Sequence, residues 1–258
     1  MSSTATRVLV GFADGTLSWL DDTGAAAPVT KEVTTGAVVS ISLGSGGKLW
    51  VGSESGSVSA VTLRDAVAEA DQGDAEVDIE VAFNHNSEPL LALGHVNWQG
   101  EACLVSCSPA GTVSTWGADL LGSLATGSEA TCMAVCSTTG LVAVGSAAGV
   151  IRLIDVSNPA EPKTVNRSRA HDGAVTHVEF DASGAYLASA GQDGKLFFTD
   201  AAGRKSFAAL GYIATPAAVT SLVWRDGSAS DGVDSEGLRL IACTASGELL
   251  QLTPPAAD

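Results

Sequence analysis

Short runs of alternating apolar and polar residues fill most of this 258-residue chain, and glycine-containing turns separate them. One unit recurs six times: an apolar run, a small polar turn that ends in Gly, and a second alternating run. The first copy reads Leu9-Val10-Gly11, then Asp14-Gly15, then Leu17 to Asp21. Runs of this length that flank a glycine turn are typical of β-hairpins, because glycine adopts positive φ at little steric cost.

The spacing of the hairpins predicts the fold class. The turn glycines lie at positions 15, 56, 111, 149, 194 and 247, with spacings of 41, 55, 38, 45 and 53 residues. The shorter spacings match a four-stranded propeller blade of about 40–45 residues. We therefore predict an all-β protein in which residues 1–258 form a single β-propeller of about six four-stranded blades, with seven also possible.

The fifth copy gives the clearest four-stranded pattern. An inner strand is predicted over 174–180, a hairpin from strands over 186–190 and 195–199, and an outer strand over 204–210. Around this hairpin the chain resembles the WD-repeat family. Ala170-His171-Asp172-Gly173 stands where that family has its Gly-His turn, and Thr199-Asp200 stands on its Trp-Asp dipeptide.

The resemblance implies a structural network in the fifth copy. In the family, a turn His, a turn Asp, a strand Ser or Thr and the Trp are joined by hydrogen bonds. Carried over to this sequence, these roles fall on His171, Asp193 and Ser189, and Thr199 replaces the Trp. Outside the fifth copy the chain resembles the family in its strand and turn pattern only. Trp116-Gly117 keeps the Trp of the dipeptide but not the Asp, and Ile154-Asp155 keeps the Asp but not the Trp.

The two ends of the repeat array predict an incompletely closed ring. A hairpin begins at Arg7 with no inner strand before it, and Thr253-Pro254-Pro255 does not continue a sheet after the last hairpin. Propellers of nuclear-pore and vesicle-coat scaffolds, which this chain resembles in size, are completed by a partner. Our hypothesis is that a partner protein donates strands at this seam; the alternatives are an error in the strand count and a sequence that is a fragment of a longer chain.

Two insertions interrupt the repeats. Residues 65–80 hold seven acidic residues and no Lys or Arg, which is typical of a solvated surface loop, although a docking segment for a basic partner is an alternative. Residues 226–237 form a second polar loop insertion, and its acidic residues are spaced too irregularly for a calcium loop of the EF-hand kind.

Charge and composition exclude several classes of protein. With 29 acidic residues against 13 Lys and Arg, the net charge is -16, which argues against direct binding of nucleic acid or of an anionic membrane surface. No apolar run has the length of a membrane span. Five cysteines and no apolar leader predict an intracellular protein, cytoplasmic or nuclear, without a disulfide framework.

Catalytic and cofactor motifs are missing from the sequence. It has no phosphate-binding glycine loop and no Gly-x-Ser-x-Gly elbow, and its four histidines follow no metal-binding spacing. The cysteines lie within apolar runs and are expected to pack in the core. We therefore predict no catalytic residues, no metal and no cofactor; a propeller enzyme or ligand binder would need side chains such as His95 and His177 in an axial channel.

Two groups of residues are candidates for an interaction surface. Trp98 precedes the Gln99-Gly100 turn and is the tryptophan expected to be most exposed. Lys163, Arg167 and Arg169 cluster on the connection into the fifth copy; they suit capture of an acidic peptide or phosphopeptide, or simply form a solvated rim. The sequence thus favours a non-catalytic protein–protein interaction scaffold within a larger assembly. The remaining alternative is the tethering domain of a nucleic-acid-handling or trafficking machine.

Overall fold

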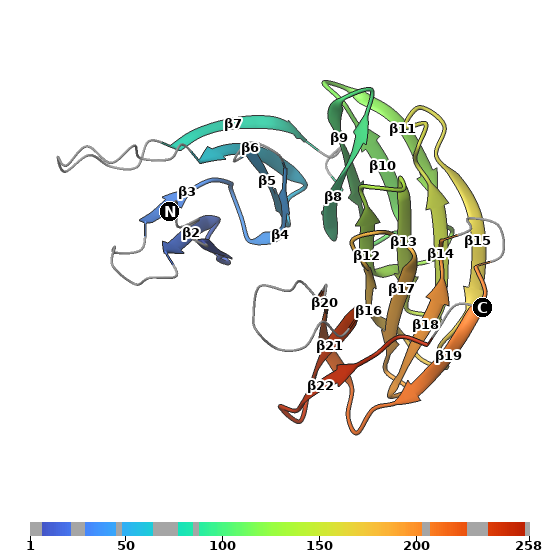
Figure 1. The fold of residues 1–258 in the computed structure, drawn as a ribbon. Coiled ribbons are helices and arrows are strands. Elements are labelled where there is room, and N and C mark those ends of the chain that lie inside the picture. Colours follow the sequence, from blue (N-terminus) through green and yellow to red (C-terminus); the bar gives the residue numbers. More distant parts are fainter. Residues whose placement is uncertain are drawn as a thin grey trace. The chain divides into compact units, whose positions relative to one another are not determined.

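The computed structural model describes residues 7–21, 29–44, 48–63, 77–84, 88–202, 207–225 and 237–255. These residues form six antiparallel sheets, and no helix occurs among them (Figure 1). The chain divides into two compact units between Gly94 and His95, a boundary that falls inside one strand, β8.

The first unit contains two sheets. The first sheet has three strands, in the order β1(Arg7–Gly11), β2(Thr16–Asp21) and β3(Val29–Glu32). The second sheet has four strands, in the order β4(Val38–Leu43), β5(Lys48–Ser53), β6(Ser57–Leu63) and β7(Val77–Asn84). Leu17 of β2 shares a hydrophobic cluster with Val38 and Ile41 of β4, so the two sheets pack against each other.

The second unit holds the other four sheets, and its first strand crosses the unit boundary. The third sheet consists of β8(Ala92–Trp98), β9(Glu101–Cys107), β10(Thr112–Trp116) and β11(Leu120–Ala125). The fourth consists of β12(Ala130–Cys136), β13(Leu141–Ser146), β14(Val150–Asp155) and β15(Lys163–Arg169). The fifth consists of β16(Val175–Phe180), β17(Tyr186–Gly191), β18(Lys195–Asp200) and β19(Ala209–Ala214). The sixth has three strands, β20(Val219–Arg225), β21(Arg239–Thr244) and β22(Leu249–Leu252).

The predicted hairpins are present in all six sheets. Every turn glycine has positive φ, for example 86° at Gly15 and 69° at Gly194, because the chain reverses direction there in a tight turn between two strands. The outer strand of the fifth sheet was wrongly placed: it is Ala209–Ala214 rather than 204–210. Asp200 Oδ1 accepts the Ala202 N–H in a turn after β18, and Arg204-Lys205-Ser206, which we expected to begin the outer strand, is a polar run.

The end sheets have three strands each among the described residues. The first sheet begins with its hairpin strand β1, and the sixth sheet stops at β22. Residues 65–76 of the predicted acidic insertion and residues 226–236 of the polar insertion lie outside the described residues, whereas residues 77–80 belong to β7.

Four inner strands share a bulge near their beginning. The pairing of β12 with β13 shifts register between Ala130 and Cys132, and β16 and β20 shift at the equivalent position. The residue skipped by the pairing is a threonine in three of these strands: Thr131 in β12, Thr176 in β16 and Thr220 in β20. In β4 it is Val39. A bulge adds twist and redirects a side chain, and here it turns a threonine hydroxyl toward neighbouring backbone.

Candidate functional site

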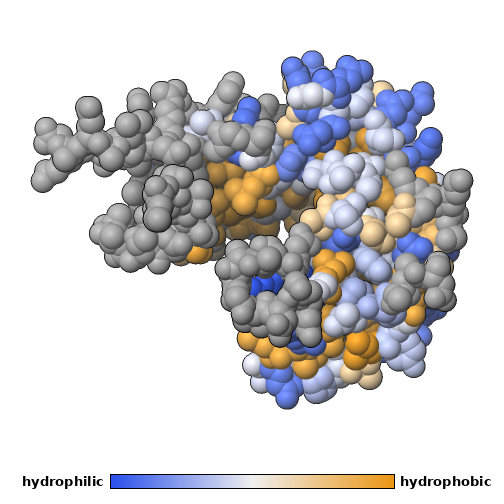
Figure 2. Space-filling model, viewed as in Figure 1, coloured by the Kyte–Doolittle hydropathy of each residue, from blue (hydrophilic) through white to orange (hydrophobic). Residues whose placement is uncertain are grey.

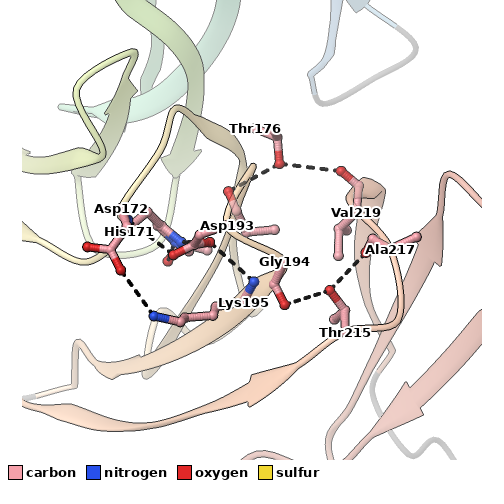
Figure 3. A network of polar contacts seen from close by, with 11 residues as sticks. His171, Asp172, Thr176, Asp193, Gly194, Lys195, Thr215, Ala217 and Val219 are labelled. Carbon is pink, nitrogen blue, oxygen red and sulfur yellow. Dashed lines mark hydrogen bonds and ion pairs between the residues drawn. The ribbon is translucent and has the colours of Figure 1, made fainter.

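A buried polar network joins the turn before β16 to the β17–β18 hairpin. His171 Nδ1 lies 3.0 Å from Asp193 Oδ1 (Figure 3). His171 Nε2 lies 3.0 Å from Ser189 Oγ. His171 and Ser189 are each only 1% exposed. The structure therefore brings together all three side chains that the WD-repeat resemblance selects, and it places them in the fold's interior rather than in an open site.

Asp193 is held as a carboxylate by its surroundings. Burial opposes its ionisation, but the hydrogen bond with His171 and the backbone N–H groups of Asp172 and Lys195 outweigh this effect, so the pKa of Asp193 lies below its ordinary value. Lys195 Nζ contacts exposed Asp172 at 3.2 Å and lies 5.5 Å above the Tyr212 ring. This side of the turn reaches solvent, where such pairs stabilise only weakly.

The third sheet contains the residues of the WD-type network that the fifth sheet lacks. Trp116 Nε1 donates a 2.7 Å hydrogen bond to Ser106 Oγ, and both residues are buried. Ser106 precedes Trp116 by ten residues, as Ser189 precedes Thr199. The fifth sheet thus has the His, Asp and Ser without the Trp, whereas the third has the Ser and Trp without the His and Asp. The sequence prediction overlooked Ser106, although the ten-residue spacing from Ser106 to Trp116 could have indicated it.

Threonine occupies the His171 position between other sheets. The backbone N–H of His171 donates to the carbonyl of Gly149 at 3.2 Å, and Gly149 is the turn glycine of the preceding sheet. The N–H groups of Thr34, Thr126 and Thr215 make the same bond to Gly15, Gly111 and Gly194. Each threonine hydroxyl then donates to the carbonyl two residues later. This turn is a repeated structural feature that no sequence motif indicated.

The candidate basic surface lies on β15, the outer strand of the fourth sheet. Lys163, Arg167 and Arg169 are all exposed, and Arg167 stands directly opposite Arg152 of β14. Like charges in directly opposed positions destabilise a sheet. Arg152 Nε is buried and has no hydrogen-bond partner within the described residues. Trp98, the other candidate, is half-buried at the end of β8 rather than fully exposed.

Several histidine and cysteine side chains lie partly or fully buried on the strands. Burial lowers the pKa of His95 and of His177, and burial raises the pKa of Cys107 to about 12. In the part of the chain that the structure describes, no three His, Cys, Asp or Glu side chains are grouped to hold a metal ion. Across the same residues, no helix has the length and apolarity of a membrane span.

The successive antiparallel sheets and their buried turn networks define an all-β repeat protein that fits a WD-repeat propeller. The chain is similar to Cilia- and flagella-associated protein 43 of Xenopus laevis, with 34% identity over 134 residues. The match covers 51% of this chain and 8% of that protein's length. No protein-family profile matches the chain.

Proposed function

We propose that this chain is a non-catalytic scaffold with a WD-repeat-like propeller fold, and that it works within a protein assembly of cilia or flagella. The similarity to Cilia- and flagella-associated protein 43 carries this proposal. The structure adds support, because the WD-type polar residues His171 and Ser189 are buried and joined by a hydrogen bond that holds two turns together. Side chains used in this way stabilise the fold and leave function to the exposed surfaces.

The outer strand β15 is the surface that we propose contacts a partner. Arg167 and Arg169 lie two residues apart on an exposed strand, so both guanidinium groups extend from the same side of it. Their repulsion with Arg152 is relieved when a carboxylate lies between them. The protein's net charge of -16 makes this basic strand distinct from the rest of the chain. An acidic segment of a partner protein is the matching ligand.

The proposal is tested in a ciliated cell that expresses the tagged chain. We expect the chain to fractionate with cilia and to elute as part of a complex larger than the 25.8 kDa monomer. Arg167→Glu should release the chain from that complex without unfolding it. Lys48→Glu makes the same charge change at another exposed position and should leave the complex intact. A chain that stays in the cell body as a free monomer would reject the proposal.

A further inference from the structure

Three arginines share one face of the β14–β15 pair in the fourth sheet. Arg152 of β14 stands directly opposite Arg167 of β15, and Arg169 lies two residues further along β15. Directly opposed residues share a face of a sheet, and so do residues two apart on one strand. We call Arg152, Arg167 and Arg169 the arginine cluster. Lys163 does not belong to it, because it stands opposite Asp155, three residues after Arg152, and hence on the other face.

The arginine cluster reaches from the interior of the sheet to solvent. Arg167 and Arg169 are exposed, whereas Arg152 is half-buried. Its neighbours on this face are apolar: Val144, directly opposite on β13, and Ile154, two residues along β14, are both buried. The Nε atom of Arg152 is buried and makes no hydrogen bond to any described residue. A buried N–H of a charged group is costly without an acceptor, and an anion that reaches Nε would remove that cost.

No acidic side chain of the described residues neutralises the arginine cluster. None of the three arginines forms a salt bridge there, although the protein has 29 acidic residues; Lys195, by contrast, contacts Asp172 at 3.2 Å. In Figure 2, viewed as Figure 1, blue hydrophilic atoms lie at the margin where Figure 1 draws β15. Because Arg152 and Arg167 are like charges in directly opposed positions, the cluster is electrostatically unfavourable until an anion binds.

The number and spacing of the guanidinium groups select the anion. Opposed residues have Cβ atoms about 5 Å apart, and residues two apart on a strand are separated by about 7 Å, so three arginine side chains can reach one small group. A carboxylate has two oxygens and a single charge, which one guanidinium fork satisfies. A phosphate monoester has three terminal oxygens and a charge of about −1.5 to −2 at pH 7, so it matches three guanidinium groups. The arginine cluster therefore favours phosphate over carboxylate.

We propose that the arginine cluster binds the phosphate group of a phosphorylated serine or threonine in the partner protein. Arg152 forms the floor of this site and supplies its buried Nε–H, and Arg167 and Arg169 contact the phosphate from the exposed strand β15. The inference rests on the proposed scaffold function, in which β15 contacts an acidic segment of a partner. It makes that contact depend on phosphorylation, so a kinase and a phosphatase control whether the partner stays attached.

The choice of phosphate is tested with three labelled peptides of one sequence, Gly-Ala-X-Ala-Gly, in which X is phosphoserine, glutamate or serine. Binding to the full chain is followed by fluorescence polarisation. We expect the phosphoserine peptide to bind at least about tenfold more tightly than the glutamate peptide, because only phosphate engages all three guanidinium groups. The serine peptide should not bind. Inorganic phosphate should displace the phosphoserine peptide, and chloride at the same ionic strength should not.

Substitutions of Arg152 separate a binding role from a structural one. Arg152→Met removes the floor of the site but keeps a long unbranched side chain, and it should weaken the phosphoserine peptide by about tenfold or more without lowering the melting temperature. Arg152→Lys keeps the charge but loses the planar fork, and it should also bind weakly. Lys163→Met is the matched control, because it removes a positive charge from the other face of the same pair of strands. It should leave the affinity within about twofold of the wild-type value.

The Nε–H of Arg152 gives a direct readout by nitrogen-15 NMR. Its signal, assigned by its loss in Arg152→Met, should shift when inorganic phosphate is added and stay in place when chloride is added. Equal affinity for the phosphoserine and glutamate peptides, or an affinity that Arg152→Met does not change, would overturn the inference. A chain that fractionates with cilia but does not bind the phosphoserine peptide would reject this inference alone and leave the scaffold proposal standing.

Discussion

The third and fifth sheets solve the same structural problem with different halves of one hydrogen-bond network. In the fifth, His171 connects Asp193 in the turn to Ser189 on the strand. In the third, the Trp116 indole N–H donates to the equivalent serine, Ser106. A buried serine hydroxyl needs a partner, and either ring nitrogen is sufficient. The full four-residue set is therefore not required for a sheet of this fold to form.

Replacing His171 should cause the largest loss of stability among the variants of these two sheets. His171→Leu leaves Ser189 and Asp193 without their buried partner and also removes the edge contact with Phe197, whose ring centroid is 5.0 Å away. We expect the free energy of unfolding to fall by about 2–4 kcal/mol in urea denaturation. Asp172→Ala, in the same turn but exposed, should change it by less than about 1 kcal/mol. Equal losses would show that the network is not the source of stability.

Removing the indole N–H from the third sheet should cost less. Trp116→Phe keeps a ring in the core but leaves Ser106 Oγ without its 2.7 Å donor. The expected loss is about 1–2 kcal/mol, because a single neutral hydrogen bond is broken. In a double-mutant cycle with Ser106→Ala, the two losses should not add, with a coupling energy of about 1 kcal/mol. Additive losses would contradict the role of this pair.

Grafting the missing tryptophan sharpens the comparison in the other direction. Thr199→Trp places an indole ten residues after Ser189, the separation found between Ser106 and Trp116. A bulge lies before both positions, between Phe198 and Thr199 and between Thr115 and Trp116. We expect a gain of about 0.5–1 kcal/mol in thermal denaturation, and Thr199→Phe should gain less because it cannot donate. No difference between the two variants would mean that the indole does not reach Ser189.

Acid should destabilise the fifth sheet before the third, and this effect should be smaller than those of the substitutions. The pKa of Asp193 is lower in the folded protein than its ordinary value of 3.8, so its stabilisation is present above that pH and is lost as the pH falls through the folded-state value. The Ser106–Trp116 pair has no titratable group. Amide hydrogen exchange between pH 5 and pH 3, corrected for intrinsic rates, should therefore show loss of protection in the β17–β18 hairpin before the β9–β10 hairpin. Asp193→Asn should abolish this difference.

The sequence was most informative where local chemistry alone determines structure. The turn glycines located all six hairpins, because positive φ at a tight turn strongly selects glycine. The His171, Ser189 and Asp193 contacts followed from the family resemblance. The Ser106–Trp116 pair was missed because it matches only half of the motif. The threonine contacts at Thr131 and Thr176 could not be predicted, since they depend on a bulge and on the carbonyl of another sheet.

The bulged threonines also determine how a disturbance spreads within the second unit. The Thr131 hydroxyl ties the fourth sheet to the fifth, and the Thr176 hydroxyl ties the fifth to the sixth, so these three sheets are coupled in sequence order. Stability in such a series is a sum of nearest-neighbour contributions rather than a single global quantity. The sixth sheet is coupled on one side only within the described residues, and it should therefore fray first and exchange its amides fastest.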